Sequence, residues 1–96
     1  MGTVESGVPT FDLDAPWQLH PQVSLRPEPF GALLYHFGSR RLSFLKDPAL
    51  TRVVEGLNGA PAARLACARA GLPEPVPARV VAGLATLART GMIERR

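Results

Sequence analysis

The chain has 96 residues, of which 46% are hydrophobic and 20% charged, and its formal net charge is +3. This length allows one small domain, and the apolar content is too high for a chain that is disordered throughout. The single cysteine excludes an internal disulfide, and no apolar run approaches the roughly 20 residues that span a bilayer. Because the N-terminus also lacks the basic start and apolar stretch of a signal peptide, we expect a cytoplasmic protein.

The first 16 residues mix Gly, Pro, Ser and Thr with scattered apolar side chains, and no periodicity holds among them. Such a stretch is typical of a flexible tail. We therefore expect a tail over residues 1–16 and a single domain over residues 17–96, with Trp17 and Leu19 as its first core contacts.

Three strands are predicted between residues 23 and 46. Residues 23–26 alternate apolar and polar side chains, and Pro27 and Pro29 then end this strand or place it at a sheet edge. Residues 32–37 and 41–46 are rich in strand-forming residues, and Gly38-Ser39 between them fits a tight turn with glycine at positive φ. We expect an antiparallel meander, with Leu42 and Phe44 on one face and Ser43 and Leu45 on the other.

Three helices are predicted after the strands. Asp47-Pro48 is a typical helix start, and an apolar stripe then repeats as far as Leu57. Residues 61–70 form a thin, alanine-rich helix that ends at Gly71, and residues 78–90 form a third helix that ends at Gly91. The prolines of residues 72–77 make the connection between the last two helices stiff.

The order is therefore β-β-β-α-α-α. Three strands cannot cover their own apolar face, so the helices must pack on it, which predicts an α+β fold of winged helix-turn-helix type: a three-stranded antiparallel sheet followed by three helices. Two functions suit that shape. Either the third helix enters a DNA groove, or the exposed sheet edge accepts a peptide strand.

The sequence contains few residues that could act in catalysis or bind a metal ion. The two histidines and Cys67 are too few and too scattered for a zinc site, and the chain has no glycine-rich phosphate loop and no paired carboxylates. Cys67 lies among alanines, as a small buried residue typically does. His36 lies within a predicted strand, which favours a structural role. We expect neither an enzyme nor a bound metal or cofactor.

The third helix favours the peptide interpretation over DNA. Arg79 and Arg89 are sparse for a groove-reading helix, whose outer face usually carries several Arg, Lys, Asn or Gln side chains. Gly83 costs about 1 kcal/mol of helix propensity relative to alanine. Either the close approach of another chain or a tight helix–sheet contact would explain it, and the sequence does not choose between them.

One long string of residues closely resembles the mycofactocin biosynthesis peptide chaperones. It comprises residues 20–23, 26–38 and 42–46 and is nearly continuous over residues 17–46, with a looser likeness over the helices to residue 94. That family belongs with precursor-peptide recognition domains similar to the small chaperone of pyrroloquinoline quinone biosynthesis.

The resemblance implies a non-catalytic module that binds the leader of a ribosomally made precursor peptide as an added strand. It also implies that the module presents this peptide to a radical S-adenosylmethionine enzyme of the same pathway, with docking between the third strand and the third helix. By position, the peptide-binding residues would be Arg41, Leu42, Ser43, Phe44, Leu45, Lys46, Arg79, Val80, Gly83, Leu84 and Leu87.

Within that set we assign expected roles. Backbone groups of Ser43 to Leu45 would set the register of the peptide. An apolar trough would be lined or supported by Leu42, Phe44, Leu84 and Leu87. The cationic side chains of Arg41, Lys46 and Arg79 would favour acidic leader residues.

Three alternatives are left open. A DNA-binding winged-helix regulator would bind duplex DNA with a steep salt dependence. A structural subunit would bind the partner enzyme but not the peptide. An exposed strand edge can also pair with a second copy, which would give a homodimer. The preferred interpretation expects no nucleic-acid or membrane partner.

Overall fold

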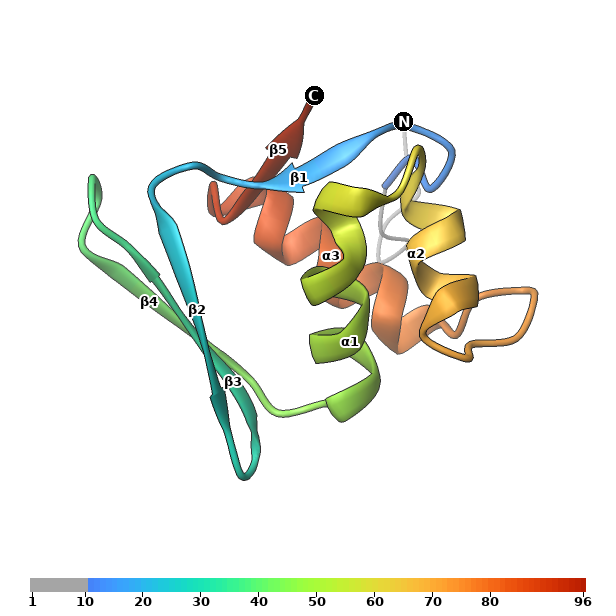
Figure 1. The fold of residues 1–96 in the computed structure, drawn as a ribbon, viewed down its shortest axis with the longest axis horizontal. Coiled ribbons are helices and arrows are strands. Elements are labelled where there is room, and N and C mark those ends of the chain that lie inside the picture. Colours follow the sequence, from blue (N-terminus) through green and yellow to red (C-terminus); the bar gives the residue numbers. More distant parts are fainter. Residues whose placement is uncertain (1–10) are drawn as a thin grey trace, which may run out of the picture.

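The computed structural model describes residues 11–96 (Figure 1). Along the chain, the elements are β1 (Trp17–Leu19), β2 (Val23–Glu28), β3 (Gly31–His36), β4 (Arg41–Leu45), α1 (Pro48–Gly56), the 3₁₀ turn η1 (Leu57–Gly59), α2 (Ala63–Arg69), α3 (Ala78–Arg89) and β5 (Ile93–Arg95). The predicted α+β class is confirmed: a three-stranded antiparallel sheet is followed by three helices, and a two-stranded sheet is added.

Strands β2, β3 and β4 form a sheet in that order, and every neighbouring pair is antiparallel. The alternation of side chains predicted for residues 41–46 is confirmed in β4, because Leu45 is buried whereas Leu42 and Phe44 are exposed. Figure 1 shows the sheet as a long ribbon beside the helices, with one face toward α1 and α3 and the other turned away from them.

The turn between β3 and β4 differs from the prediction. The left-handed residue is Arg40, with a φ of 62°, rather than Gly38, and the Arg40 N–H donates to the carbonyl of His36 at 2.7 Å. The loop therefore spans residues 37–40 instead of a two-residue turn. Gly38 is small for another reason: a Cβ there would lie 2.3 Å from the side-chain oxygen of Gln22.

The helix boundaries follow local chemistry. The Asp47 carboxylate accepts from the Ala49 N–H at 2.9 Å and caps α1, with Pro48 in its first turn, as predicted. Gly71 and Gly91 lie just beyond α2 and α3 with φ of 86° and 80°, so both predicted helix stops are confirmed. The second helix is shorter than predicted and begins at Ala63.

The two-stranded sheet joins the two ends of the described chain. β1 pairs with β5 in antiparallel register, Gln18 donates to Glu94 at 2.8 Å, and the N–H of His20 donates to the carbonyl of Met92 at 2.9 Å. A short extended end is expected at residues 92–94 from the sequence, and β5 confirms it. Strands of only three residues show no alternating pattern, which explains why their pairing was not predicted.

Of the tail predicted over residues 1–16, residues 1–10 lie outside the described residues. Residues 11–16 pack on the domain: Phe11 stacks on Trp17 with ring centroids 4.5 Å apart, and Ala15 is buried. Arg64 joins this segment to the loop after α2, because it bonds both Asp14 and Glu74. Core contacts therefore begin before Trp17.

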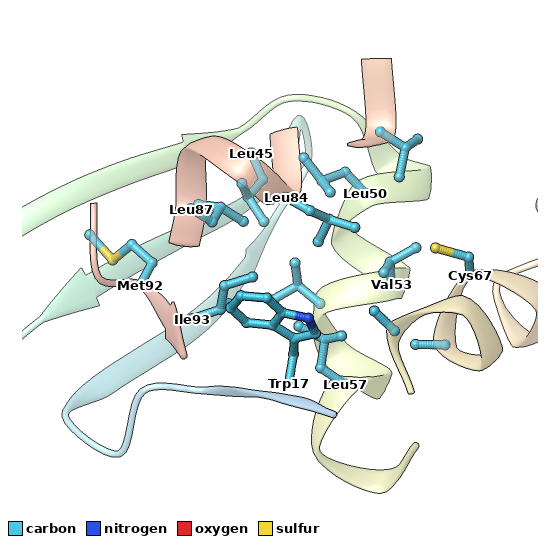
Figure 2. Packing of buried hydrophobic residues seen from close by; sticks show 14 of the residues in the cluster. Trp17, Leu45, Leu50, Val53, Leu57, Cys67, Leu84, Leu87, Met92 and Ile93 are labelled. Carbon is cyan, nitrogen blue, oxygen red and sulfur yellow. The ribbon is translucent and has the colours of Figure 1, made fainter. Parts of the chain in front are cut away.

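The core lies between the sheet, the helices and the β1–β5 pair. Figure 2 shows Leu45 of β4, Leu50 of α1 and Leu84 and Leu87 of α3 gathered on one side, with Trp17, Leu57 and Ile93 next to them. All of these side chains are at least nine-tenths buried. This cluster fixes the position of α3 relative to β4.

Candidate functional site

The outer edge of β4 is unpaired among the described strands, because β4 pairs only with β3. The backbone register shows which of its groups face outward. The Phe37 N–H donates to the Gln22 carbonyl at 2.9 Å, so in β3 the odd-numbered residues bond to β2 and the even-numbered residues bond to β4. Arg41, Ser43 and Leu45 pair with those even-numbered residues and therefore turn their N–H and C=O groups toward β3.

The groups that face the open edge are consequently those of Leu42 and Phe44. This corrects the expectation that the backbone of Ser43 to Leu45 would set the register of a docked peptide, since the amides of Ser43 and Leu45 are already used within the sheet. Leu42 and Phe44 each present one N–H and one C=O, which gives four free backbone groups for an added strand.

A groove of about 260 Å³ runs beside this edge, between β4 and α3. Its lining is mostly apolar and comes from three elements: Ser43, Phe44 and Leu45 of β4, Leu50 of α1, and Gly83, Thr86 and Leu87 of α3. The groove thus lies where a strand added to β4 would pass against α3.

Gly83 lies in the wall of the groove, close to α1. A Cβ at Gly83 would lie 2.7 Å from the Cδ2 methyl of Leu50, which is closer than real Cβ contacts. The glycine therefore serves a tight contact between α3 and α1, and the missing side chain also leaves space in the groove wall. The contact at Gly83 is therefore intramolecular, but it is made with α1 and not with the sheet, which corrects the expected helix–sheet contact.

The structure brings together part of the predicted peptide-binding set. Ser43, Phe44, Leu45, Gly83 and Leu87 line the groove. Val80 and Leu84 are fully buried and support it from below, as Leu84 was expected to do.

Leu42 does not line the groove. Its side chain is 55% exposed on the face of the sheet that is turned away from the helices. Phe44 lies two residues along the strand, so its side chain shares that outer face even though Phe44 also borders the groove. Leu50 and Thr86 line the groove although they were absent from the predicted set. Leu50 had been visible only as part of the apolar stripe of the first helix, and nothing in the sequence shows that this stripe reaches β4.

The three cationic side chains of the predicted set have different surroundings. Arg41 and Lys46 are exposed at the two ends of β4, where they remain available to a ligand. Arg79 donates to the Asp47 carboxylate at 2.7 Å and thereby ties α3 to the start of α1. Its charge is partly balanced, so it attracts an acidic residue less than Arg41 or Lys46 does.

Asp47 has two roles, as a helix cap and as the partner of Arg79. Burial of its carboxylate acts to raise the pKa, but hydrogen bonds from Arg79 and from the Ala49 N–H outweigh it, so the pKa of Asp47 lies below its usual value. The side chain is therefore charged at neutral pH and orients Arg79 in the first turn of α3.

The other polar candidates have structural partners. The Nδ1 of His36 accepts from the Ser39 N–H at 3.1 Å within the β3–β4 turn. Cys67 is buried, and burial raises the pKa of its thiol, which makes it a poor nucleophile. Over residues 11–96, no group of three or more potential ligands could hold a metal ion. None of the helices described is both long and apolar enough to cross a bilayer.

A comparison with protein families shows which family the chain resembles over most of its length. A model of the Peptide chaperone MftB family matches residues 16–94, which is most of the chain. The chain belongs to the peptide chaperone MftB family. The family is named for a binding role rather than for a reaction, so the expectation of a non-catalytic protein is confirmed.

Three relatives named "Peptide chaperone MftB" support this membership. The chain is 48% identical over 88 residues to the protein of Mycobacterium ulcerans, which is 92% of this chain and 81% of the relative. It is 49% identical over 84 residues to that of Mycolicibacterium smegmatis (88% and 82%) and over 86 residues to that of Mycobacterium tuberculosis (90% and 79%). The search of solved structures found no match.

Proposed function

We propose that this MftB-family chain binds the leader of a ribosomally made precursor peptide as a fourth strand on the open edge of β4, and that it presents the peptide to a radical S-adenosylmethionine enzyme of the same pathway. The observation that carries the proposal is the combination of an unpaired edge with an apolar groove directly beside it. The family name supports a peptide as the ligand.

The magnitudes show why both features are needed. Four edge hydrogen bonds, at roughly 0.5–1.5 kcal/mol each, contribute about 2–6 kcal/mol. Ordering a disordered peptide costs about 2–5 kcal/mol, which offsets most of that gain. One aliphatic side chain buried in the groove adds about 1.5–3 kcal/mol, so the groove accounts for most of the net affinity. We therefore expect a leader segment with alternating apolar residues, one of which enters the groove.

Charge at the two ends of β4 supports an acidic peptide. Arg41 and Lys46 are exposed and flank the open edge, and the whole chain carries a net charge of +3. Acidic leader residues placed opposite these two side chains would steer the peptide into its orientation. This contribution should weaken as salt increases.

The test is a calorimetric titration with the precursor peptide, using substitutions at Leu42. Leu42→Pro removes one N–H from the open edge and leaves the bonds to β3 intact, whereas Leu42→Ala shortens the same side chain but keeps the N–H. Loss of one hydrogen bond of about 1 kcal/mol predicts roughly fivefold weaker binding for Leu42→Pro than for Leu42→Ala. Pro27 occupies an equivalent outward position in β2, so the sheet tolerates proline at an edge.

Two further measurements make the titration decisive. Ser43→Pro removes a bond within the sheet and should lower the midpoint of thermal unfolding, whereas Leu42→Pro should leave it nearly unchanged. A duplex DNA of mixed sequence should not compete with the peptide. A folded Leu42→Pro variant that binds the peptide as tightly as Leu42→Ala would exclude strand addition at this edge.

A further inference from the structure

The outer face of the three-stranded sheet carries the large apolar side chains that remain most exposed between residues 11 and 96. These are Phe30, Phe37, Leu42 and Phe44, with exposed fractions of 40%, 58%, 55% and 59%. All of them lie in β4 or in the turns that flank β3. Exposed apolar side chains scattered singly are normal, but a group on one face indicates a surface that another molecule covers.

Cross-strand register arranges these side chains in rows. Ser24, Tyr35 and Leu42 lie opposite one another across the sheet, and Arg26, Leu33 and Phe44 form the adjacent row. Two aromatic contacts border the rows, with ring centroids 5.3 Å apart for Tyr35 and Phe37 and 6.2 Å apart for Phe30 and Phe44.

The centre of this face is a hollow of about 250 Å³. Its lining residues are Ser24, Arg26, Leu33, Tyr35, Phe37 and Leu42. The face is turned away from α1 and α3 in Figure 1, so none of these helices covers it. A protruding apolar side chain of a partner would fit the hollow.

Charged groups around the hollow identify the chemistry of the occupant. Arg40 in the adjoining turn is exposed and takes no part in an ion pair with another residue of the described chain. The acidic group next to the face, Glu28, is already paired with Arg26 at 2.9 Å. A partner surface with an apolar projection and an acidic rim is therefore complementary, whereas a second copy would bring cationic rims together.

We propose that the outer sheet face, defined by Leu33, Tyr35, Phe37 and Leu42, docks the folded enzyme that modifies the peptide, through an apolar projection surrounded by acidic residues. This rests on the proposed function, because it assigns a surface to the enzyme named there. Aromatic anchors in a partly hollow surface are typical of residues that dominate a protein–protein interface.

Peptide and enzyme would then use different groups of one strand. In β4, the backbone of Leu42 faces the open edge, whereas its side chain lies on the outer face. The groove lies between β4 and α3, on the side of the sheet that faces the helices. Both ligands can therefore bind at once, with the peptide held at the border of the enzyme surface.

The experiment measures binding of the purified enzyme to the immobilised full chain by biolayer interferometry, with peptide affinity determined in parallel. Phe37→Asp places a carboxylate in the apolar centre and should weaken enzyme binding at least tenfold, while peptide affinity stays within twofold. Arg40→Glu should slow enzyme association severalfold, most strongly at low salt. Ala68→Asp and Arg52→Glu make the same charge changes on exposed positions of α2 and α1 and should leave both affinities unchanged.

The outcomes separate this inference from the proposed function. Equal enzyme binding by wild type and a folded Phe37→Asp variant, with peptide still bound, overturns the docking face but not the peptide role. Competition between peptide and enzyme for one site also overturns it. A wild-type chain that dimerises through this face, with Phe37→Asp monomeric and enzyme binding unaffected, assigns the face to self-association instead. Failure of the wild type to bind the peptide overturns the proposed function.

Discussion

Substitution of Gly83 by alanine tests the groove and the packing beneath it at the same time. The added methyl group would lie 2.7 Å from the Cδ2 of Leu50, so the Leu50 side chain must move. Because Leu50 lines the groove, it can turn into open space rather than into the core. The cost of this overpacking is therefore at the low end of the usual range, about 1 kcal/mol, and the better helix propensity of alanine contributes about 1 kcal/mol in return.

We consequently expect the unfolding free energy of Gly83→Ala to lie within about 1 kcal/mol of wild type, with a clear loss of peptide affinity. The displaced Leu50 methyl and the new methyl remove contact for one or two methylene groups of the ligand, at about 0.8 kcal/mol each, which predicts binding weaker by roughly 4- to 15-fold. Urea unfolding and calorimetric titration of the same samples give the two quantities.

The matched control is Gly56→Ala at the end of α1. A Cβ there meets nothing within 4 Å, and the backbone conformation, with φ of −95° and ψ of 0°, suits alanine. This substitution should stabilise the fold by about 0.5–1 kcal/mol and leave peptide binding unchanged. The reasoning is refuted if Gly83→Ala stabilises the chain as much as Gly56→Ala does and binds the peptide as wild type.

Two further predictions concern charge and the second sheet edge. Because the folded-state pKa of Asp47 is lowered, its charged form stabilises the fold above about pH 4, and this contribution is lost as the pH falls through the folded value. Asp47→Asn keeps the helix cap, so urea unfolding should show a smaller fall in stability between pH 5 and pH 2.5 than in wild type, and an identical fall would contradict the assignment. Pro27→Val restores an outward N–H on β2 and should increase self-association in analytical ultracentrifugation, whereas an unchanged sedimentation profile would show that proline does not protect this edge.

Patterns that depend on nearby residues predicted most of this fold. Three such features are confirmed, and each is determined by a few neighbouring residues: the alternation of side chains in β4, the helix start at Asp47-Pro48, and the glycines after α2 and α3. The β1–β5 pair joins residues that are more than 70 positions apart, and nothing local marks such a contact. The turn before β4 was predicted wrongly because glycine was assumed to take the positive φ that Arg40 adopts.

The candidate site was predicted in outline but not in detail. Its expected position between the third predicted strand, which is β4, and the third helix came from the family resemblance, and a groove lies between these two elements. The sequence could not show which backbone groups of β4 are free, because that depends on whether the odd or the even residues of β3 bond to β2. The sequence also could not place Leu50 at the groove, since the apolar stripe of a helix does not reveal which other element it packs against.

An edge that must accept one strand must also avoid pairing with a copy of itself. The two edges of this sheet differ in how they meet that need. At β2, Pro27 lacks the N–H that would face outward, so that edge is a poor template for a further strand. Proline at an outward position of β4 would remove an N–H that an added strand needs, and there Arg41 and Lys46 lie at opposite ends of the strand instead. An antiparallel copy would bring each of these cations near a cation of its partner, whereas an acidic leader would neutralise them. Under the proposed function, the same charges would therefore disfavour a homodimer and favour the peptide.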